Sequence, residues 1–145
     1  MEGMTLPDVT LGREPYELTT TALGYGAMSL AGAYGPISEE AAIALLHDVY
    51  GRGVTFLDTA NIYGLGVSET ILGTFLRGRR HEFMVATKAG IDPSGEAGKR
   101  RQNGKPEHLR EQIELSLRRL GTDYVDLYYL HRPDPEVPIE ESVGT

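Results

Sequence analysis

The feature that most constrains the fold is a regular alternation of short apolar segments with amphipathic helical ones. Four segments are expected to form short strands, at residues 23–27, 54–57, 83–87 and 124–130. Each is almost continuously apolar instead of alternating, which is typical of parallel strands covered on both faces. The chain is therefore expected to adopt a parallel α/β fold.

Three helices are expected between these strands, at residues 38–50, 68–76 and 106–120. Ser38 can cap the first helix, and Pro106 opens the third, where its missing N–H costs nothing. Each helix is followed by a glycine that can end it, namely Gly51, Gly78 and Gly121. Apolar residues repeat along the first helix with helical spacing, and this predicts a buried face made of Ala42, Leu45, Leu46, Val49 and Tyr50.

Three other regions complete the chain. Residues 5–10 and 16–20 are β-prone and are separated by Gly12 and Pro15, which predicts an N-terminal hairpin. Residues 90–105 are expected to form a long polar loop. Residues 138–143 resemble the start of a fourth helix.

Two architectures fit this order of elements, the doubly wound sheet and the (β/α)₈ barrel. The dinucleotide fingerprint G-x-G-x-x-G begins with Gly24 and Gly26, but Ser29 stands at its third glycine position. A long loop follows in place of an immediate helix, so the fingerprint fails in both sequence and context.

Composition narrows the expected partners. The net charge of −7 argues against nucleic acid, because phosphate backbones attract basic surfaces. No apolar run is long enough to span a bilayer, and no signal peptide is evident, so we expect a cytoplasmic protein that does not bind membranes. There is no cysteine, and the histidines show no metal-ligand spacing, so we expect no metal site.

Ionisable residues stand where the apolar strands stop. Asp58 follows the second strand, Lys88 the third and His131 the fourth, while Tyr63 lies in the loop after Asp58. In a parallel barrel these strand ends open onto the face that carries the active site. Neighbouring strands lie about 4.8 Å apart, so three of them bring these side chains within roughly 10 Å.

This set of side chains suits the reduction of a carbonyl group. A phenol is a poor acid at neutral pH, and a neighbouring ammonium group makes it a better proton donor. Lys88 can supply the ammonium, with Asp58 holding it in place, so Tyr63 can protonate a developing alkoxide. His131 can orient the carbonyl by a hydrogen bond. A nicotinamide cofactor would then supply the hydride.

The sequence resembles the aldo-keto reductase family over almost its full length. The resemblance rests on GVTFLDTA (53–60) with Tyr63-Gly64, on ATK (86–88), and on LRRLGTDY (117–124) running to LYYLH (127–131). It implies a (β/α)₈ barrel of TIM type and NADPH as cofactor. It also implies a catalytic tetrad of Asp58, Tyr63, Lys88 and His131. Gly26, Ala27 and Met28 match the loop that usually touches the nicotinamide ribose, and Asp58 is also expected to bind the cofactor.

The chain departs from this family in length, because a (β/α)₈ barrel typically needs about 250 residues and this chain has 145. We expect one partial barrel domain over residues 1–145, truncated after the fourth strand. The resemblance implies that most cofactor contacts lie in the absent half. The function expected is NADPH-dependent reduction of an aldehyde or ketone. The alternative is an inactive half-barrel fragment that self-associates through its open edges into a homo-oligomer.

Overall fold

A four-stranded parallel sheet forms the centre of the computed structural model, which describes residues 6–92 and 101–145. Its strands are β3 (Gly24–Gly26), β4 (Phe56–Asp58), β5 (Met84–Ala89) and β8 (Leu127–Leu130). They lie side by side in the order in which the chain visits them. Barrels have this sequential order, whereas a doubly wound sheet reverses it at a switch point. The described strands therefore form about half of a barrel, as predicted.

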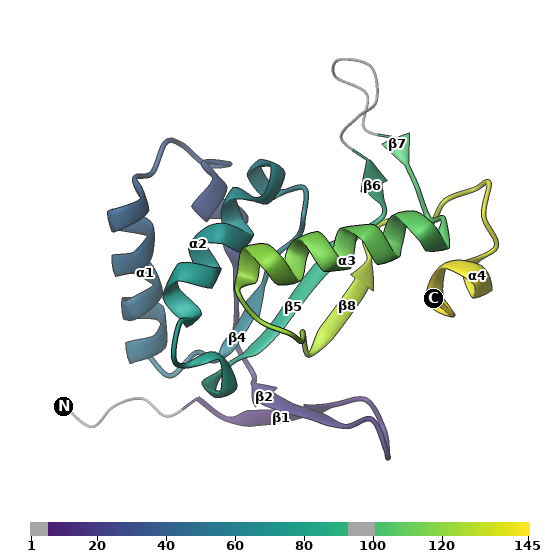
Figure 1. Ribbon diagram of the computed structural model, residues 1–145. Helices are drawn as coiled ribbons and strands as arrows, with labels where there is room; N and C mark the ends of the chain where they lie inside the picture. Colours follow the sequence, from purple (N-terminus) through teal and green to yellow (C-terminus); the bar gives the residue numbers. More distant parts are fainter. Residues whose placement is uncertain (1–5, 93–100) are drawn as a thin grey trace.

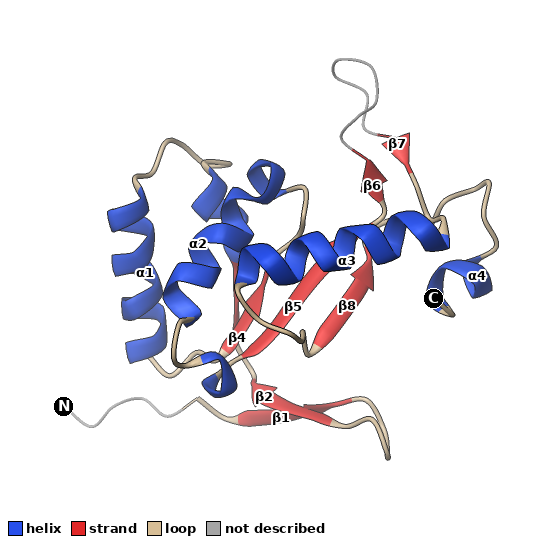
Figure 2. Cartoon of the chain, viewed as in Figure 1, coloured by secondary structure: helices blue, strands red, loops and turns tan. Residues whose placement is uncertain are grey.

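The helices lie on one side of this sheet (Figure 1). They are α1 (Glu39–Gly51), α2 (Val67–Leu76) and α3 (Pro106–Leu120), with a short α4 (Ile139–Val143) near the end of the chain. In Figure 2, α1, α2 and α3 are drawn in blue on the parallel sheet in red, and the remaining described strands lie outside that sheet. The core between these helices and the sheet is formed by buried side chains that include Leu46, Leu57, Leu72, Val85 and Leu120. None of the described helices has the length and apolar character needed to cross a membrane.

The first helix differs from its prediction at its end and on its face. Ser38 caps α1 as expected, since its hydroxyl accepts from the backbone N–H of Ala41 at 3.2 Å. Gly51 does not follow the helix but is its last residue, and the first left-handed residue after it is Gly53, with φ of 85°. Leu45 is exposed, because the buried side of α1 is a narrow stripe centred on Ala42 and Leu46.

The predicted N-terminal hairpin is present as β1 (Asp8–Leu11) paired antiparallel with β2 (Leu18–Thr21). It lies beyond the N-terminal ends of the parallel strands (Figure 1). The Thr21 hydroxyl joins it to the sheet, since it donates to the carbonyl of Leu23 at 2.9 Å and accepts from the N–H of Thr55 at 3.1 Å. The hairpin is thus fixed at the end opposite the ionisable residues.

The segment at residues 90–105 is not wholly irregular, contrary to the prediction. It contains β6 (Ile91–Asp92) paired antiparallel with β7 (Arg101–Gln102), and residues 93–100 between them lie outside the described residues. The N–H of Asn103 also donates to the carbonyl of Gly90 at 3.0 Å. Strands of two residues carry too little hydrophobic alternation to be seen in the sequence.

Candidate active site

The strand register brings the predicted ionisable residues to one end of the sheet. Asp58, the last residue of β4, lies opposite Gly26 of β3 and Ala86 of β5. Lys88 lies two residues further along β5, opposite Tyr129 of β8. Both side chains therefore lie at the C-terminal ends of parallel strands, the position of active sites in barrel enzymes.

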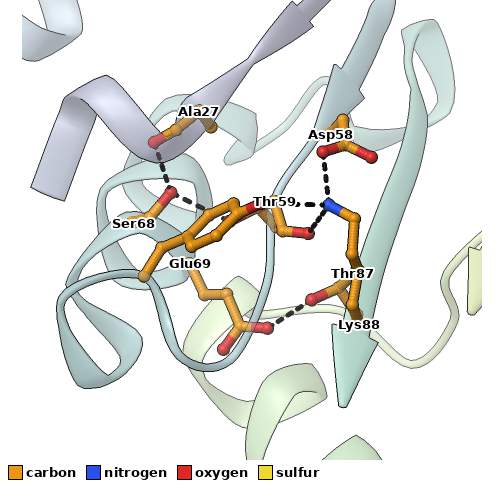
Figure 3. A network of polar contacts seen from close by, with 8 residues as sticks. Ala27, Asp58, Thr59, Ser68, Glu69, Thr87 and Lys88 are labelled. Atoms are coloured by element: carbon orange, nitrogen blue, oxygen red, sulfur yellow. Dashed lines mark hydrogen bonds and ion pairs between the residues drawn. The ribbon is translucent and has the colours of Figure 1, made fainter. Parts of the chain in front are cut away.

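Lys88 is the centre of the cluster (Figure 3). Its ammonium forms an ion pair with the Asp58 carboxylate and donates to the carbonyl oxygen of Thr59 at 2.9 Å. It also makes a long contact of 3.4 Å with the hydroxyl of Tyr63. A lysine ammonium has three N–H donors, so these three acceptors account for all of them. With its side chain only 15% exposed, Lys88 is held in one position.

Tyr63 and His131 complete the group of four. Tyr63 begins a 3₁₀ helix, η2 (Tyr63–Gly66), shortly after β4, and its ring lies 5.1 Å from the Lys88 ammonium. The His131 ring meets the Tyr63 ring edge to face, with centroids 6.0 Å apart. The backbone N–H of His131 donates to the carbonyl of Ala89 at 2.7 Å, and this fixes His131 beside the end of β5. The three residues predicted from the strand ends thus lie together with Tyr63, which was predicted from the loop after β4.

The residues expected to touch a cofactor differ in how exposed they are. Gly26 is exposed, and a Cβ placed on it would meet no atom within 4 Å, so open space adjoins it and the facing Asp58. Met28 is half-buried in a 3₁₀ helix, η1 (Ala27–Ala31). Ala27 is wholly buried in the core, and its carbonyl accepts from Ser68 at 2.8 Å. Gly26 and Asp58 therefore border the open side, whereas Ala27 faces inward.

Tyr128, on the neighbouring strand β8, serves a different purpose from Tyr63. Its hydroxyl donates to the carbonyl of Leu109 in α3 at 2.9 Å. Burial, together with the nearby carboxylate of Glu69, raises the pKa of Tyr128 above its ordinary value. This phenol therefore keeps its proton and joins strand to helix.

Sequence reasoning missed the polar groups that contact Lys88 or support Thr59 and Thr87 beside it. Thr59 contributes a backbone carbonyl, which no side-chain pattern can indicate. Ser68 and Glu69 stand at the start of α2, where such residues ordinarily cap a helix. Both are wholly buried here. The only indication in the sequence was that Ser68 and Glu69 directly precede an apolar run. This position does not show which strands the two side chains contact.

A parallel sheet in barrel order, with ionisable side chains gathered at its C-terminal end, defines a (β/α) barrel with an enzyme-like site. A sequence model of the Aldo/keto reductase family matches residues 22–145. The chain belongs to the aldo-keto reductase family.

Two curated proteins that are similar in sequence agree with this assignment. The chain is 40% identical over 143 residues to "Aldo-keto reductase yakc [NADP(+)]" of Schizosaccharomyces pombe. This match covers 97% of this chain and 41% of that protein. It is 41% identical to "Probable aldo-keto reductase 1" of Glycine max, over 99% of this chain and 41% of that protein. The chain thus spans about two fifths of the length of these curated relatives.

A solved structure gives the same result for the fold. The holo form of aldo-keto reductase AKR11C1 from Bacillus halodurans superimposes with a TM-score of 0.84 at 33% identity. The match covers 96% of this chain and 44% of that one. The fold described here is therefore that of part of an aldo-keto reductase barrel.

Proposed function

We propose that this chain provides the catalytic side chains of an oxidoreductase that reduces an aldehyde or ketone with NADPH. The observation that carries the proposal is the contact of one half-buried ammonium, that of Lys88, with both Asp58 and Tyr63. An ammonium beside a phenol favours the phenolate, so it helps the phenol to release its proton. Tyr63 is accordingly the proton donor to the carbonyl oxygen of the substrate.

The other residues of the group support this step. Asp58 orients Lys88, since the two form an ion pair at the end of adjacent strands. His131, with its ring against that of Tyr63, is placed to hydrogen-bond the substrate carbonyl and to orient it toward the phenol. The half-buried setting strengthens each of these electrostatic effects, because less water screens them.

The cofactor assignment is supported by relatives and by the open space beside Gly26. One relative carries NADP(+) in its name, and the Bacillus halodurans structure is described as a holo form. Gly26 presents no side chain to that space, and the Asp58 carboxylate beside it can accept from a ribose hydroxyl. The hydride comes from NADPH when it is bound.

The test compares two tyrosine variants. Tyr63→Phe removes the donor hydroxyl, and we expect it to abolish carbonyl reduction while leaving the unfolding midpoint in urea nearly unchanged. Tyr16→Phe is the matched control, because Tyr16 is 82% exposed in the hairpin at the opposite end of the sheet. Full activity in Tyr63→Phe would refute the proposal.

A second candidate is a half-barrel without activity of its own. The observation that favours it is the sheet itself, since β3 and β8 each have only one paired neighbour among the described strands. Titration with NADPH, followed by nicotinamide fluorescence and light scattering, separates the two candidates. Saturable micromolar binding supports the reductase, and no binding at high protein concentration supports the inactive half-barrel.

A further inference from the structure

Two consecutive residues at the start of α2, Ser68 and Glu69, contact residues at the C-terminal ends of β3, β4 and β5, where the candidate site lies (Figure 3). Both side chains are wholly buried. The proposed mechanism uses neither of them. Burying a carboxylate and a hydroxyl is costly unless both are fully hydrogen-bonded, so the partners of this pair indicate its purpose.

Ser68 joins the cofactor side of the site to the end of β4. Its hydroxyl donates to the carbonyl of Ala27 at 2.8 Å and lies 2.8 Å from the Thr59 hydroxyl. A hydroxyl has one proton, and the Ala27 carbonyl can only accept, so the Thr59 hydroxyl is the donor to Ser68. The carbonyl of the same Thr59 accepts from the Lys88 ammonium. Ser68 thus fixes the residue that holds Lys88.

Glu69 fixes the strand that carries Lys88. One carboxylate oxygen accepts from the Thr87 hydroxyl at 2.6 Å, and the other accepts from the Arg119 guanidinium of α3 at 2.6 Å. Side chains alternate along a strand, so Thr87 faces the helices while Lys88 faces the other side of β5. The Glu69–Thr87 bond therefore sets the position of β5 at the level of Lys88.

We propose that Ser68 and Glu69 are positioning residues that hold Lys88 in its contacts with Asp58 and Tyr63. The catalytic part of this proposal rests on the proposed function, whereas the position of Lys88 can be measured without any activity. A displacement of about 1 Å in a catalytic group is enough to cost about 100-fold in rate. Loss of this pair should therefore act on turnover more than on substrate binding.

The experiment uses Glu69→Gln and Ser68→Ala, with Asp126→Asn as the matched control. Asp126 also forms an ion pair of low exposure, with Arg80 at 2.6 Å, and also anchors β5, by accepting from the N–H of Val85 at 2.8 Å. It does so at the opposite end of the strand from Lys88. Ser68→Ala removes one hydroxyl only, so it carries the test if Glu69→Gln does not fold.

Two quantities are measured in each variant. The first is the ¹H–¹⁵N signal of the Lys88 ammonium, which is visible while hydrogen bonds protect it from exchange with water, and which is assigned by its absence in Lys88→Met. The second is kcat and KM for carbonyl reduction with NADPH. We expect both test variants to lose or shift the Lys88 signal and to lower kcat about 10- to 100-fold, with KM changed far less.

The outcomes separate this inference from the proposed function. A wild-type protein that does not reduce carbonyls refutes the function, while the Lys88 signal still tests the positioning. An unchanged Lys88 signal in both Ser68→Ala and Glu69→Gln overturns the inference. The same changes of signal and kcat in Asp126→Asn also overturn it, since they would reflect a general loss of stability.

Discussion

Gly73 lies where α2 crosses the end of α3, and the two backbones meet there without a side chain between them. A Cβ placed on Gly73 would lie 2.3 Å from the carbonyl oxygen of Arg119. By contrast, a Cβ on Gly51, the last residue of α1, would meet no atom within 4 Å. The two helical glycines therefore differ in kind: one permits a close approach, and the other has no packing purpose.

Alanine substitutions at these two glycines should have opposite effects on the free energy of unfolding. Alanine favours a helix over glycine by up to about 1 kcal/mol, so Gly51→Ala should be stabilising. At Gly73 the overlap should cost about 1–3 kcal/mol and outweigh that gain. Urea unfolding of both variants checks this, and a stabilising Gly73→Ala would show that α2 and α3 are not so close.

Tyr128 offers a second test at the scale of one residue. Tyr128→Phe removes the hydroxyl that donates to the Leu109 carbonyl, and we expect a loss of about 1 kcal/mol of stability. Carbonyl reduction should persist, because this phenol keeps its proton and lies outside the candidate site. Loss of turnover in Tyr128→Phe, with an unfolding midpoint close to that of the wild type, would contradict this assignment.

The sequence predicted which ionisable residues meet at the candidate site better than it predicted the buried residues that hold them in position. Asp58, Lys88 and His131 could be found because each ends an apolar run, and their strands are parallel neighbours. The fit of Ser68 and Glu69 could not be found, because it depends on how α2 is rotated against β4 and β5. The strand bounds were also displaced by up to three residues, since strand ends are set by pairing with neighbours and not by local composition.

Among the elements, the segment before α3 and the one before α4 are joined through a single carboxylate. Asp134 is buried, and its two oxygens accept from the N–H groups of Gly104 at 2.8 Å and Glu136 at 2.9 Å. Ser142 of α4 donates to the carbonyl of Gly104 at 2.7 Å. The backbone donors, that of Gly104 above all, hold the pKa of Asp134 below its ordinary value.

This linkage predicts a pH-dependent effect of Asp134→Asn. Because the pKa is lower in the folded protein, the carboxylate stabilises the fold at pH values above the pKa of the unfolded chain, about 3.9. That stabilisation is lost as the pH falls through the lower pKa of the folded protein. The variant should therefore be less stable than the wild type at pH 7, and the difference should shrink below about pH 4. Urea unfolding at several pH values measures it, and a difference independent of pH would contradict the assignment.

At the scale of the whole molecule, the described half-barrel has open sides. Strand β8 lacks a second neighbour among the described strands. An apolar groove lies between β8, α3 and α4, and its lining includes Leu109, Ile113, Leu130 and Val143. Unpaired strand edges and exposed apolar surface both favour association with another chain.

A polypeptide of these 145 residues is therefore expected to self-associate. Its sedimentation coefficient should rise with concentration, and Val143→Lys, which places a charge in the groove, should reduce that rise. Leu65→Lys is the control, because Leu65 is 70% exposed and lies away from the groove, while Val143 is 71% exposed. A constant mass of 15.9 kDa at all concentrations would contradict the prediction.

The sequential order of the parallel strands also bears on synthesis. Each strand of the parallel sheet pairs with the strand of that sheet made just before it, and the connection between them contains one α-helix. Chains fold from the N-terminus as they leave the ribosome, and short sequence separations close quickly. Asp58, Tyr63, Lys88 and His131 can therefore reach their mutual positions during translation, as soon as β8 and His131 have emerged.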